Sequence, residues 1–181
     1  MSGTAAPCIA APPPRRVDGR LLLPVPEAAW ALPSVPLRLR EGIELAPKSE
    51  LHVTLVGSRL GGELRRVLGE AVRDAALDAA TAGLDWRLWR SGRLLLLRKR
   101  DRDGPRGRMR LRHALVEPVD LAAMAPLHRA LGRLLGRQLP LPPPHVTLYV
   151  AGDRRGIGLP SRSMLRACRL REVAAAELGG G

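Results

Sequence analysis

Residues 52–55 read His-Val-Thr-Leu, and the same four residues return at 145–148. The chain holds four histidines among 181 residues, and also four threonines, so only ~0.09 His-x-Thr triplets are expected by chance. Both tetrapeptides lie in stretches of β-favouring residues, which predict strands over 51–57 and 145–150. Because side chains alternate along a strand, each His shares a face with its Thr, while Val and Leu face the core. The repeat therefore predicts two presented His-Thr pairs in one fold.

Two amphipathic helices are expected beside these strands. Apolar residues recur at helical spacing from Glu63 to about Ala82, before Gly83, and again from Leu121 to Arg137. Residues 27–47 are expected to form a turn or short helix followed by a loop. Further strands are predicted over 20–25, 84–90, 93–100, 108–117 and 167–173, with hairpin turns at Ser91-Gly92 and 101–107. The fold class is α+β, and the repeated strand and helix favour a pseudo-duplicated domain with two facing lobes.

The length fits a single domain with a proper core. Residues 1–16, rich in Ala and Pro, are expected to form a flexible tail, residues 17–174 the bilobal domain, and residues 175–181 a second flexible tail. The only cysteines are Cys8 and Cys168, which indicates no disulfide framework. We expect a monomer.

The charge of the chain is strongly positive. It has 30 Lys+Arg against 17 Asp+Glu, a formal net charge of +13, and 28 of the basic residues are Arg. Such a surface attracts phosphate-rich molecules, anionic membranes and acidic proteins alike, although codon bias in a GC-rich genome produces the same excess of Arg. No apolar stretch approaches the ~20 residues of a membrane-spanning helix, and the N-terminus lacks a secretory signal. We therefore expect a cytoplasmic protein that does not associate with membranes.

The two His-Thr pairs suit acid–base chemistry on a phosphate. Imidazole gives or takes a proton near neutral pH, so two histidines on opposite sides of one substrate supply a general base and a general acid. A Thr hydroxyl beside each His can donate a hydrogen bond to a phosphoryl oxygen as charge develops there. Such a site needs neither a metal nor a cofactor.

Two His-x-Thr-hydrophobic motifs 93 residues apart in a basic chain of this size resemble the two-histidine (2H) phosphoesterase superfamily. The most similar branch is the bacterial 2'-5' RNA ligase-like group, also described as RNA 2',3'-cyclic phosphodiesterases. The resemblance implies a bilobal α+β fold with pseudo-twofold symmetry, in which two antiparallel sheets form a central cleft and the helices lie outside. It implies metal-independent cleavage of a 2',3'-cyclic phosphate on RNA or a nucleotide to a 2'-phosphate. His52 and His145 would be catalytic, with His52 the acid and His145 the base by analogy, and Thr54 and Thr147 would bind phosphate.

One feature departs from the ligase-like pattern. Many members carry a basic residue shortly after the second motif, whereas here Tyr149, Val150 and Ala151 follow it. A phosphate clamp must then come from other residues. The candidates for RNA or phosphate contacts are Arg154 and Arg155, and the face formed by Arg108, Arg110 and Arg112. With Arg98 to Arg100, that face is either a positive wall for RNA or a solvated hairpin edge that discourages aggregation.

The remaining candidates favour structural roles. His113 and His128 are expected to be structural or solvated, since no metal-ligand spacing connects them, and neither Cys resembles a nucleophile. Trp86, Trp89 and Tyr149 would stack on a base or pack in the core, and Tyr149 points away from His145 in a regular strand.

Three functions follow from this pattern. The first is a metal-independent 2',3'-cyclic phosphodiesterase, with 2'-5' RNA ligation as a possible reverse mode. The second keeps the site but acts on 2'-5' oligonucleotides or an ADP-ribose cyclic phosphate. The third is a basic RNA-binding module in which the histidines are catalytically idle.

Overall fold

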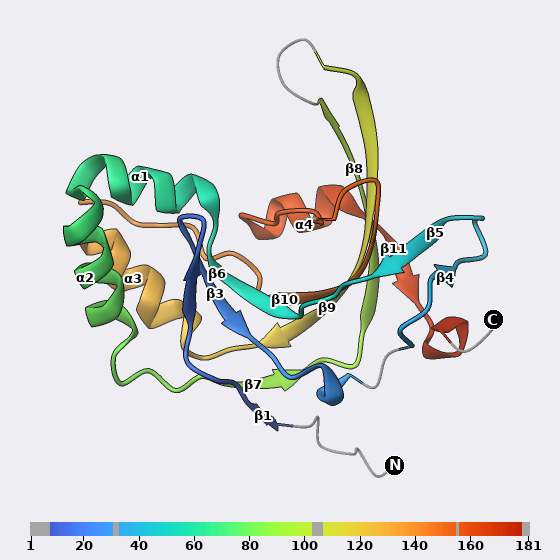
Figure 1. Cartoon of the computed structure of the whole chain (residues 1–181), viewed down its shortest axis with the longest axis horizontal. Helices are drawn as coiled ribbons and strands as arrows, with labels where there is room; N and C mark the ends of the chain where they lie inside the picture. Colours follow the sequence, from blue (N-terminus) through green and yellow to red (C-terminus); the bar gives the residue numbers. More distant parts are fainter. Residues whose placement is uncertain (1–7, 31–32, 103–106, 155, 179–181) are drawn as a thin grey trace.

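The computed structural model describes residues 8–30, 33–102, 107–154 and 156–178. The fold class is α+β, as expected: a curled antiparallel sheet carries four α-helices in the described part of the chain (Figure 1). The strands are β1 Cys8–Ala10, β2 Arg15–Val17, β3 Arg20–Pro24, β4 Leu37–Arg38, β5 Glu44–Pro47, β6 His52–Val56, β7 Arg87–Arg90, β8 Leu94–Arg102, β9 Met109–Asp120, β10 His145–Ala151 and β11 Arg169–Val173. The helices are α1 Ser58–Leu68, α2 Glu70–Thr81, α3 Met124–Leu134 and α4 Arg162–Cys168, with 3-10 turns η1 Glu27–Ala29 and η2 Ala175–Leu178.

Both His-Thr strands lie at the middle of the sheet. The strand order is β1-β7-β9-β10-β6-β3-β2, so β10 and β6 are neighbours, and Val146 pairs with Val53 in antiparallel register. Strand β5 also pairs with β10, but with a later part of it, through Pro47 and Ala46. Residues 48–51 connect β5 to β6 and interrupt the pairing along this edge of β10. The strands thus join into a single curled sheet rather than the two separate sheets that were expected.

The helix expected over 63–82 is two helices. Helix α1 starts at Ser58, directly after β6, and Gly69 separates it from α2 with a φ of +77°. Gly has no Cβ and takes this left-handed conformation without the steric cost that other residues meet. The early start places the first turn of α1 beside the end of β6. Gly61 then packs on the β2–β3 turn, where a Cβ atom would lie 1.8 Å from the Gly19 carbonyl oxygen.

The Ser91-Gly92 turn does not form a hairpin. Strands β7 and β8 both pair with β9, through Arg90↔Val119 and Leu95↔Val116. They therefore follow one another along the same edge of β9. Gly92, with a φ of +70°, allows the chain to bend between them without reversing. The hairpin expected around 101–107 joins β8 and β9, and it extends away from the body of the molecule in Figure 1.

Other segments also contain more structure than expected. Strands β1 and β2 form within the predicted tail of residues 1–16, and β4 and β5 within the predicted loop of 27–47. Helix α4 precedes β11, where only a strand was predicted near 167–173. Each missed strand is two to four residues long. Strands β1 and β5 pair with the distant strands β7 and β10, which local periodicity does not reveal, whereas β2 pairs with β3 and β4 with β5 across short turns.

The main core lies on the face of the sheet opposite the motif side chains, and a smaller buried cluster that includes Val116, the partner of Thr147, lies on the motif face. Val53, Leu55 and Val146 are buried in the main core, as the alternation predicts. Glu117 of β9 pairs with Val146, and its side chain is fully buried. Its carboxylate accepts hydrogen bonds from Trp30 Nε1 at 2.7 Å, from Arg90 Nη2 at 2.8 Å and from the Gly92 backbone N–H at 2.9 Å. This buried ion pair joins η1, β7 and β9 beneath the centre of the sheet.

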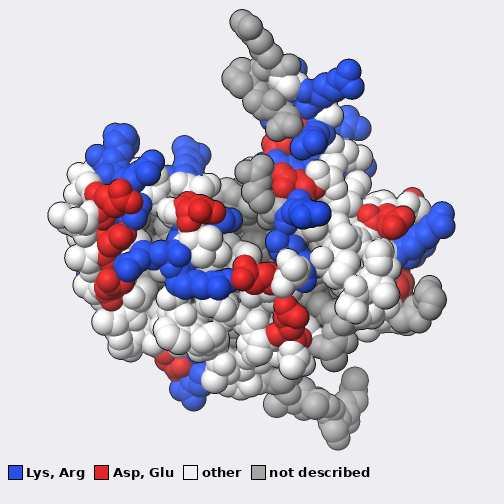
Figure 2. Space-filling model, in the orientation of Figure 1, with Lys and Arg blue, Asp and Glu red and all other residues white. Residues whose placement is uncertain are grey.

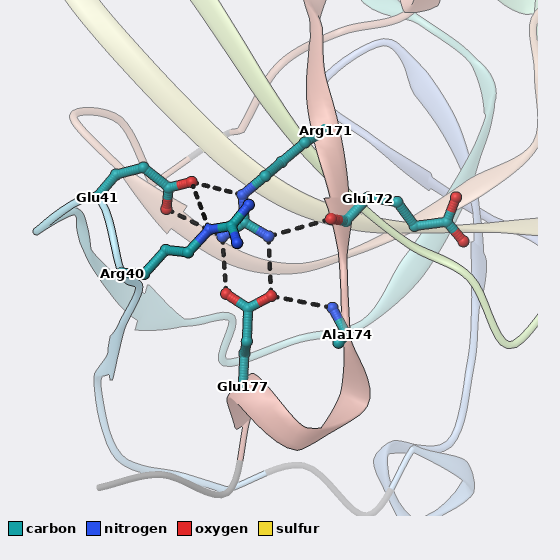
Figure 3. Close-up of polar contacts among 6 residues, drawn as sticks. All are labelled: Arg40, Glu41, Arg171, Glu172, Ala174 and Glu177. Carbon is teal, nitrogen blue, oxygen red and sulfur yellow. Dashed lines mark hydrogen bonds and ion pairs between the residues drawn. The ribbon is translucent and has the colours of Figure 1, made fainter.

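Arg171 fixes the C-terminal segment, part of which was expected to be a flexible tail (Figure 3). Its guanidinium donates to Glu177 in η2 at 2.7 and 2.9 Å and to Glu41, beside the β4–β5 turn, at 2.5 and 3.0 Å. The Glu177 carboxylate also accepts the Ala174 backbone N–H at 3.1 Å. One side chain thus connects β11, η2 and the turn between β4 and β5.

We predict that Arg171→Gln lowers the Tm by about 2–4 °C at pH 7. The Arg171 hydrogen bond holds the pKa of Glu41 at about 2, below its ordinary value of 4.5. A depressed carboxyl pKa stabilises the fold above the unfolded value, and this contribution is lost as the pH falls toward the folded value. The difference in Tm between wild type and variant, measured in thermal melts, should therefore become smaller below pH 4.5. Arg169→Gln, on the same strand, is the control; an equal effect there, or a difference independent of pH, would contradict the account.

Candidate active site

The register of β6 and β10 brings the two motifs together. Val53 pairs with Val146, and this pair sets the register of the two strands. One residue further in each direction, the same register places His52 opposite Thr147 and His145 opposite Thr54. All four side chains then lie on one face, and all four are half-buried. The two histidines are diagonal neighbours, which lie roughly 7–8 Å apart in a regular sheet, with their Cβ atoms somewhat closer. That spacing suits two imidazoles that contact one tetrahedral group from opposite sides.

A cavity of about 490 Å³ opens over this face, and the surface in Figure 2 is hollowed between the helical side of the molecule and the β8–β9 hairpin. Its floor includes the two His-Thr pairs. One wall is the start of α1 with its preceding Gly57, and the others are the loops over 137–143 and 157–160. Much of the lining is aliphatic or proline, and the described lining residues include no Tyr or Trp. The aliphatic and proline residues are Leu55, Leu60, Leu139, Pro140, Pro142, Pro143, Ile157, Leu159 and Pro160.

His145 is held in one orientation by the loop that precedes it. Its Nδ1 lies 2.9 Å from the Pro143 carbonyl oxygen, so Nδ1–H donates and the Nε2 lone pair remains available. Burial lowers the pKa of His145, and the bond to Pro143 opposes that shift. The neutral ring therefore presents a basic Nε2 at the cavity.

His52 has a different environment. Its Nδ1 is buried without a hydrogen-bond partner among the described residues. Burial, together with the charges of Lys48, Arg20 and His145, lowers the pKa of His52 to about 4, and the charge of Glu50 opposes that shift. Both imidazoles are thus neutral at pH 7 in the empty cavity, and an anion bound between them would favour their protonation.

The threonine hydroxyls are available to a ligand. Neither Thr54 nor Thr147 makes a side-chain hydrogen bond to any residue that the structure describes. The loop after β10 packs against Thr147: a Cβ atom on Gly156 would lie 3.3 Å from its methyl group. Gly156 therefore lets this loop approach the second motif closely.

The cations at the cavity differ from those expected. Lys48, Arg59 and Arg137 line it, whereas Arg108, Arg110, Arg112 and Arg154 are not among its lining residues. Arg112 instead contacts Asp101 and lies 3.1 Å from Asp153, between β8, β9 and the loop after β10. Arg155 lies outside the described residues.

Lys48 reaches the site through the interruption between β5 and β6. Its backbone N–H donates to the Leu148 carbonyl at 2.9 Å, and its Nζ donates to the Arg154 carbonyl at 2.8 Å. Burial lowers the pKa of Lys48. Lys48 stands four residues before His52 and is one of two lysines in the chain, a signal that could have drawn attention to it.

The other sequence candidates lie outside the two His-Thr pairs, although His128 also lines the cavity. His128 is buried in α3 and its Nε2–H donates to the Leu55 carbonyl at 2.9 Å, which ties α3 to β6. Burial lowers the pKa of His128, so the ring is neutral there. The Tyr149 ring is buried, with its hydroxyl donating to the Pro33 carbonyl at 2.8 Å. His113, Trp86 and Trp89 do not line the cavity.

Neither a metal cluster nor a membrane-crossing helix is found in the described ranges. No group of three or more His, Cys, Asp and Glu side chains there is arranged to hold a metal ion. None of the helices in that part of the chain combines the length and apolar character that a membrane crossing requires.

Comparisons with protein-family models, curated proteins and solved structures found no match for the chain. The function proposed below therefore rests on the geometry of the site and on the resemblance of the two motifs.

We predict that His52 titrates near pH 4 and His145 below pH 6.5, because burial disfavours both imidazolium ions. Histidine proton resonances, assigned with His52→Ala and His145→Ala, measure both values by NMR. Inorganic phosphate in the cavity should raise them by roughly one to three units. A His52 titration at or above pH 6.5 without phosphate would refute this description of the site.

Proposed function

We propose that this protein is a 2H phosphoesterase that hydrolyses 2',3'-cyclic phosphates of RNA or nucleotides to 2'-phosphates. The observation that carries the proposal is the juxtaposition of His52-Val-Thr54 and His145-Val-Thr147 on neighbouring central strands, beneath one cavity. Two imidazoles and two hydroxyls on one face form a symmetric set of proton donors and acceptors for a phosphate. A central antiparallel pair also has a local twofold axis, which is compatible with the pseudo-twofold 2H fold.

In the proposed mechanism His145 is the base and His52 is the acid. His145 Nε2 accepts a proton from water, because its Nδ1–H is fixed on the Pro143 carbonyl and stabilises the imidazolium that forms. The water oxygen attacks phosphorus in line with the 3' oxygen. His52, which is protonated when the anionic substrate is bound, gives its proton to the 3' oxygen as the P–O3' bond breaks. The products are a 2'-phosphate and a 3'-hydroxyl, and a proton returned from His145 to His52 through solvent restores the site.

The rest of the cavity stabilises the charge that develops on phosphorus. Thr54 and Thr147 hydroxyls donate to the non-bridging oxygens, and Lys48 and Arg59 supply positive charge at the same cavity. The aliphatic wall excludes water and contacts the sugar or base without aromatic stacking. With the 5'-hydroxyl of a second ribose in place of water, the same steps form a 2'-5' phosphodiester and a free 3'-hydroxyl. The reverse of those steps cleaves the 2'-5' linkage to a cyclic phosphate and a 5'-hydroxyl.

The experiment is hydrolysis of 2',3'-cyclic nucleotides and of a short RNA ending in a cyclic phosphate, with EDTA present and the 2'- and 3'-phosphate products separated. We predict a 2'-phosphate product, with kcat/KM reduced about 10²–10⁴-fold in His52→Ala and in His145→Ala. Each variant removes one proton-transfer step without opening the core.

His113→Ala is the matched control, since His113 is outside the cavity, and it should keep wild-type turnover. RNA binding that survives both active-site variants, with no turnover by the wild type, would instead indicate a binding module. Turnover confined to 2'-5' oligonucleotides or ADP-ribose cyclic phosphate would change the proposed substrate and leave the proposed mechanism unchanged.

A further inference from the structure

A second groove of about 560 Å³ runs along α3 and the loop after it. We call it the α3 groove. It shares His128, Arg137 and Leu139 with the catalytic cavity, so the two hollows meet at these residues. Among the residues that the structure describes, its lining contains three arginines, Arg129, Arg133 and Arg137, and no carboxylate.

Two of the three arginines lie on α3, and the third follows the end of the helix. Arg129 and Arg133 are four residues apart on α3, which rises about 6 Å over four residues, so their side chains share a face. Arg137 lies three residues beyond Leu134, the last residue of α3. All three are exposed. The spacing of Arg129 and Arg133 is comparable with that of successive phosphates in an extended single strand of RNA.

The turn that ends α3 fixes the position of Arg137. The Gly136 N–H donates to the Arg133 carbonyl and the Arg137 N–H to the Gly132 carbonyl, at 3.2 and 3.0 Å, which is a Schellman motif. Gly136 has a φ of +63°. A Cβ atom on Gly132 would lie 2.6 Å from the Arg137 carbonyl oxygen, so the glycine permits this close return of the chain. Arg137 is therefore held where the two hollows meet.

The outer two arginines carry uncompensated charge. Arg137 pairs with Glu63 at 2.7 Å, but neither Arg129 nor Arg133 forms an ion pair or side-chain hydrogen bond with any described residue. By contrast, Arg112, on the face predicted to be an RNA wall, is held by two aspartates. Exposed Arg side chains in a carboxylate-free groove bind phosphates by charge and by paired N–H donors.

We propose that the α3 groove binds the RNA backbone upstream of the cyclic phosphate, with Arg129 and Arg133 on successive phosphates. The inference rests on the proposed function and deepens it, since it makes an RNA chain, rather than a free cyclic nucleotide, the preferred substrate. The terminal nucleotide occupies the catalytic cavity, and the preceding nucleotides pass Arg137 and follow α3.

The test compares R129Q/R133Q with wild type on two substrates: 2',3'-cyclic CMP and an eight-nucleotide RNA ending in a cyclic phosphate. The variant should raise KM for the RNA roughly tenfold at low salt and leave cyclic CMP turnover unchanged. The dependence of log KM on log salt for the RNA should become shallower by about 1.4, from two lost contacts at about 0.7 each. R129K/R133K, which keeps the charge, should recover most of the affinity.

The matched control is R98Q/R100Q, which removes the same charge from the exposed face of β8 and should leave the RNA KM unchanged. A larger effect in this control, or equal effects of R129Q/R133Q on both substrates, would overturn the proposal. Fluorescence anisotropy with a labelled RNA ending in a 2'-phosphate gives a Kd that needs no turnover. If the proposed reaction fails, a Kd weakened only by R129Q/R133Q still supports the groove, and an unchanged Kd refutes it.

Discussion

The candidate site depends on one pairing, that of Val53 with Val146 between β6 and β10. In a sheet, a shift of one residue sends every side chain of a strand to the opposite face. The buried valines and leucines of the two motifs prevent that shift, since it would expose them and bury His and Thr. The same apolar residues that hold the strands in the core therefore place both His-Thr pairs in one cavity. The function we propose follows from this register.

The surroundings of the pair reinforce its position and set its protonation. On the core face, Glu117 is buried opposite Val146 and bound by Arg90, Trp30 and the Gly92 backbone, so removal of Arg90 would leave a buried charge unpaired. On the cavity face, burial lowers the pKa of both motif histidines. When an anion enters the cavity, its negative charge raises the pKa of the neutral imidazoles. In the mechanism we propose, substrate binding would therefore also protonate His52, the acid.

The sequence was most informative where the alternation of polar and apolar residues coincides with the repeated His-Val-Thr-Leu tetrapeptide. The β6 and β10 strands, the burial of their Val and Leu side chains and the α+β class could all be predicted from it. The break at Gly69 was missed because apolar spacing continues across it, although its left-handed backbone ends α1. The β7–β8 bend was mistaken for a hairpin because Ser-Gly permits either geometry, and only pairing with β9 decides between them. Lys48 and Arg137 reach the cavity through a strand interruption and a helix cap, which depend on contacts distant in sequence.

The central claim is that His52 and His145 act on one phosphate as a unit. The most direct measurement is a double-mutant cycle on kcat/KM for a 2',3'-cyclic phosphate, with His52→Ala, His145→Ala and the double variant. Residues of one catalytic unit are strongly non-additive. The account predicts that the double variant loses about as much activity as either single variant. Losses that multiply, or a single variant with wild-type activity, would contradict it.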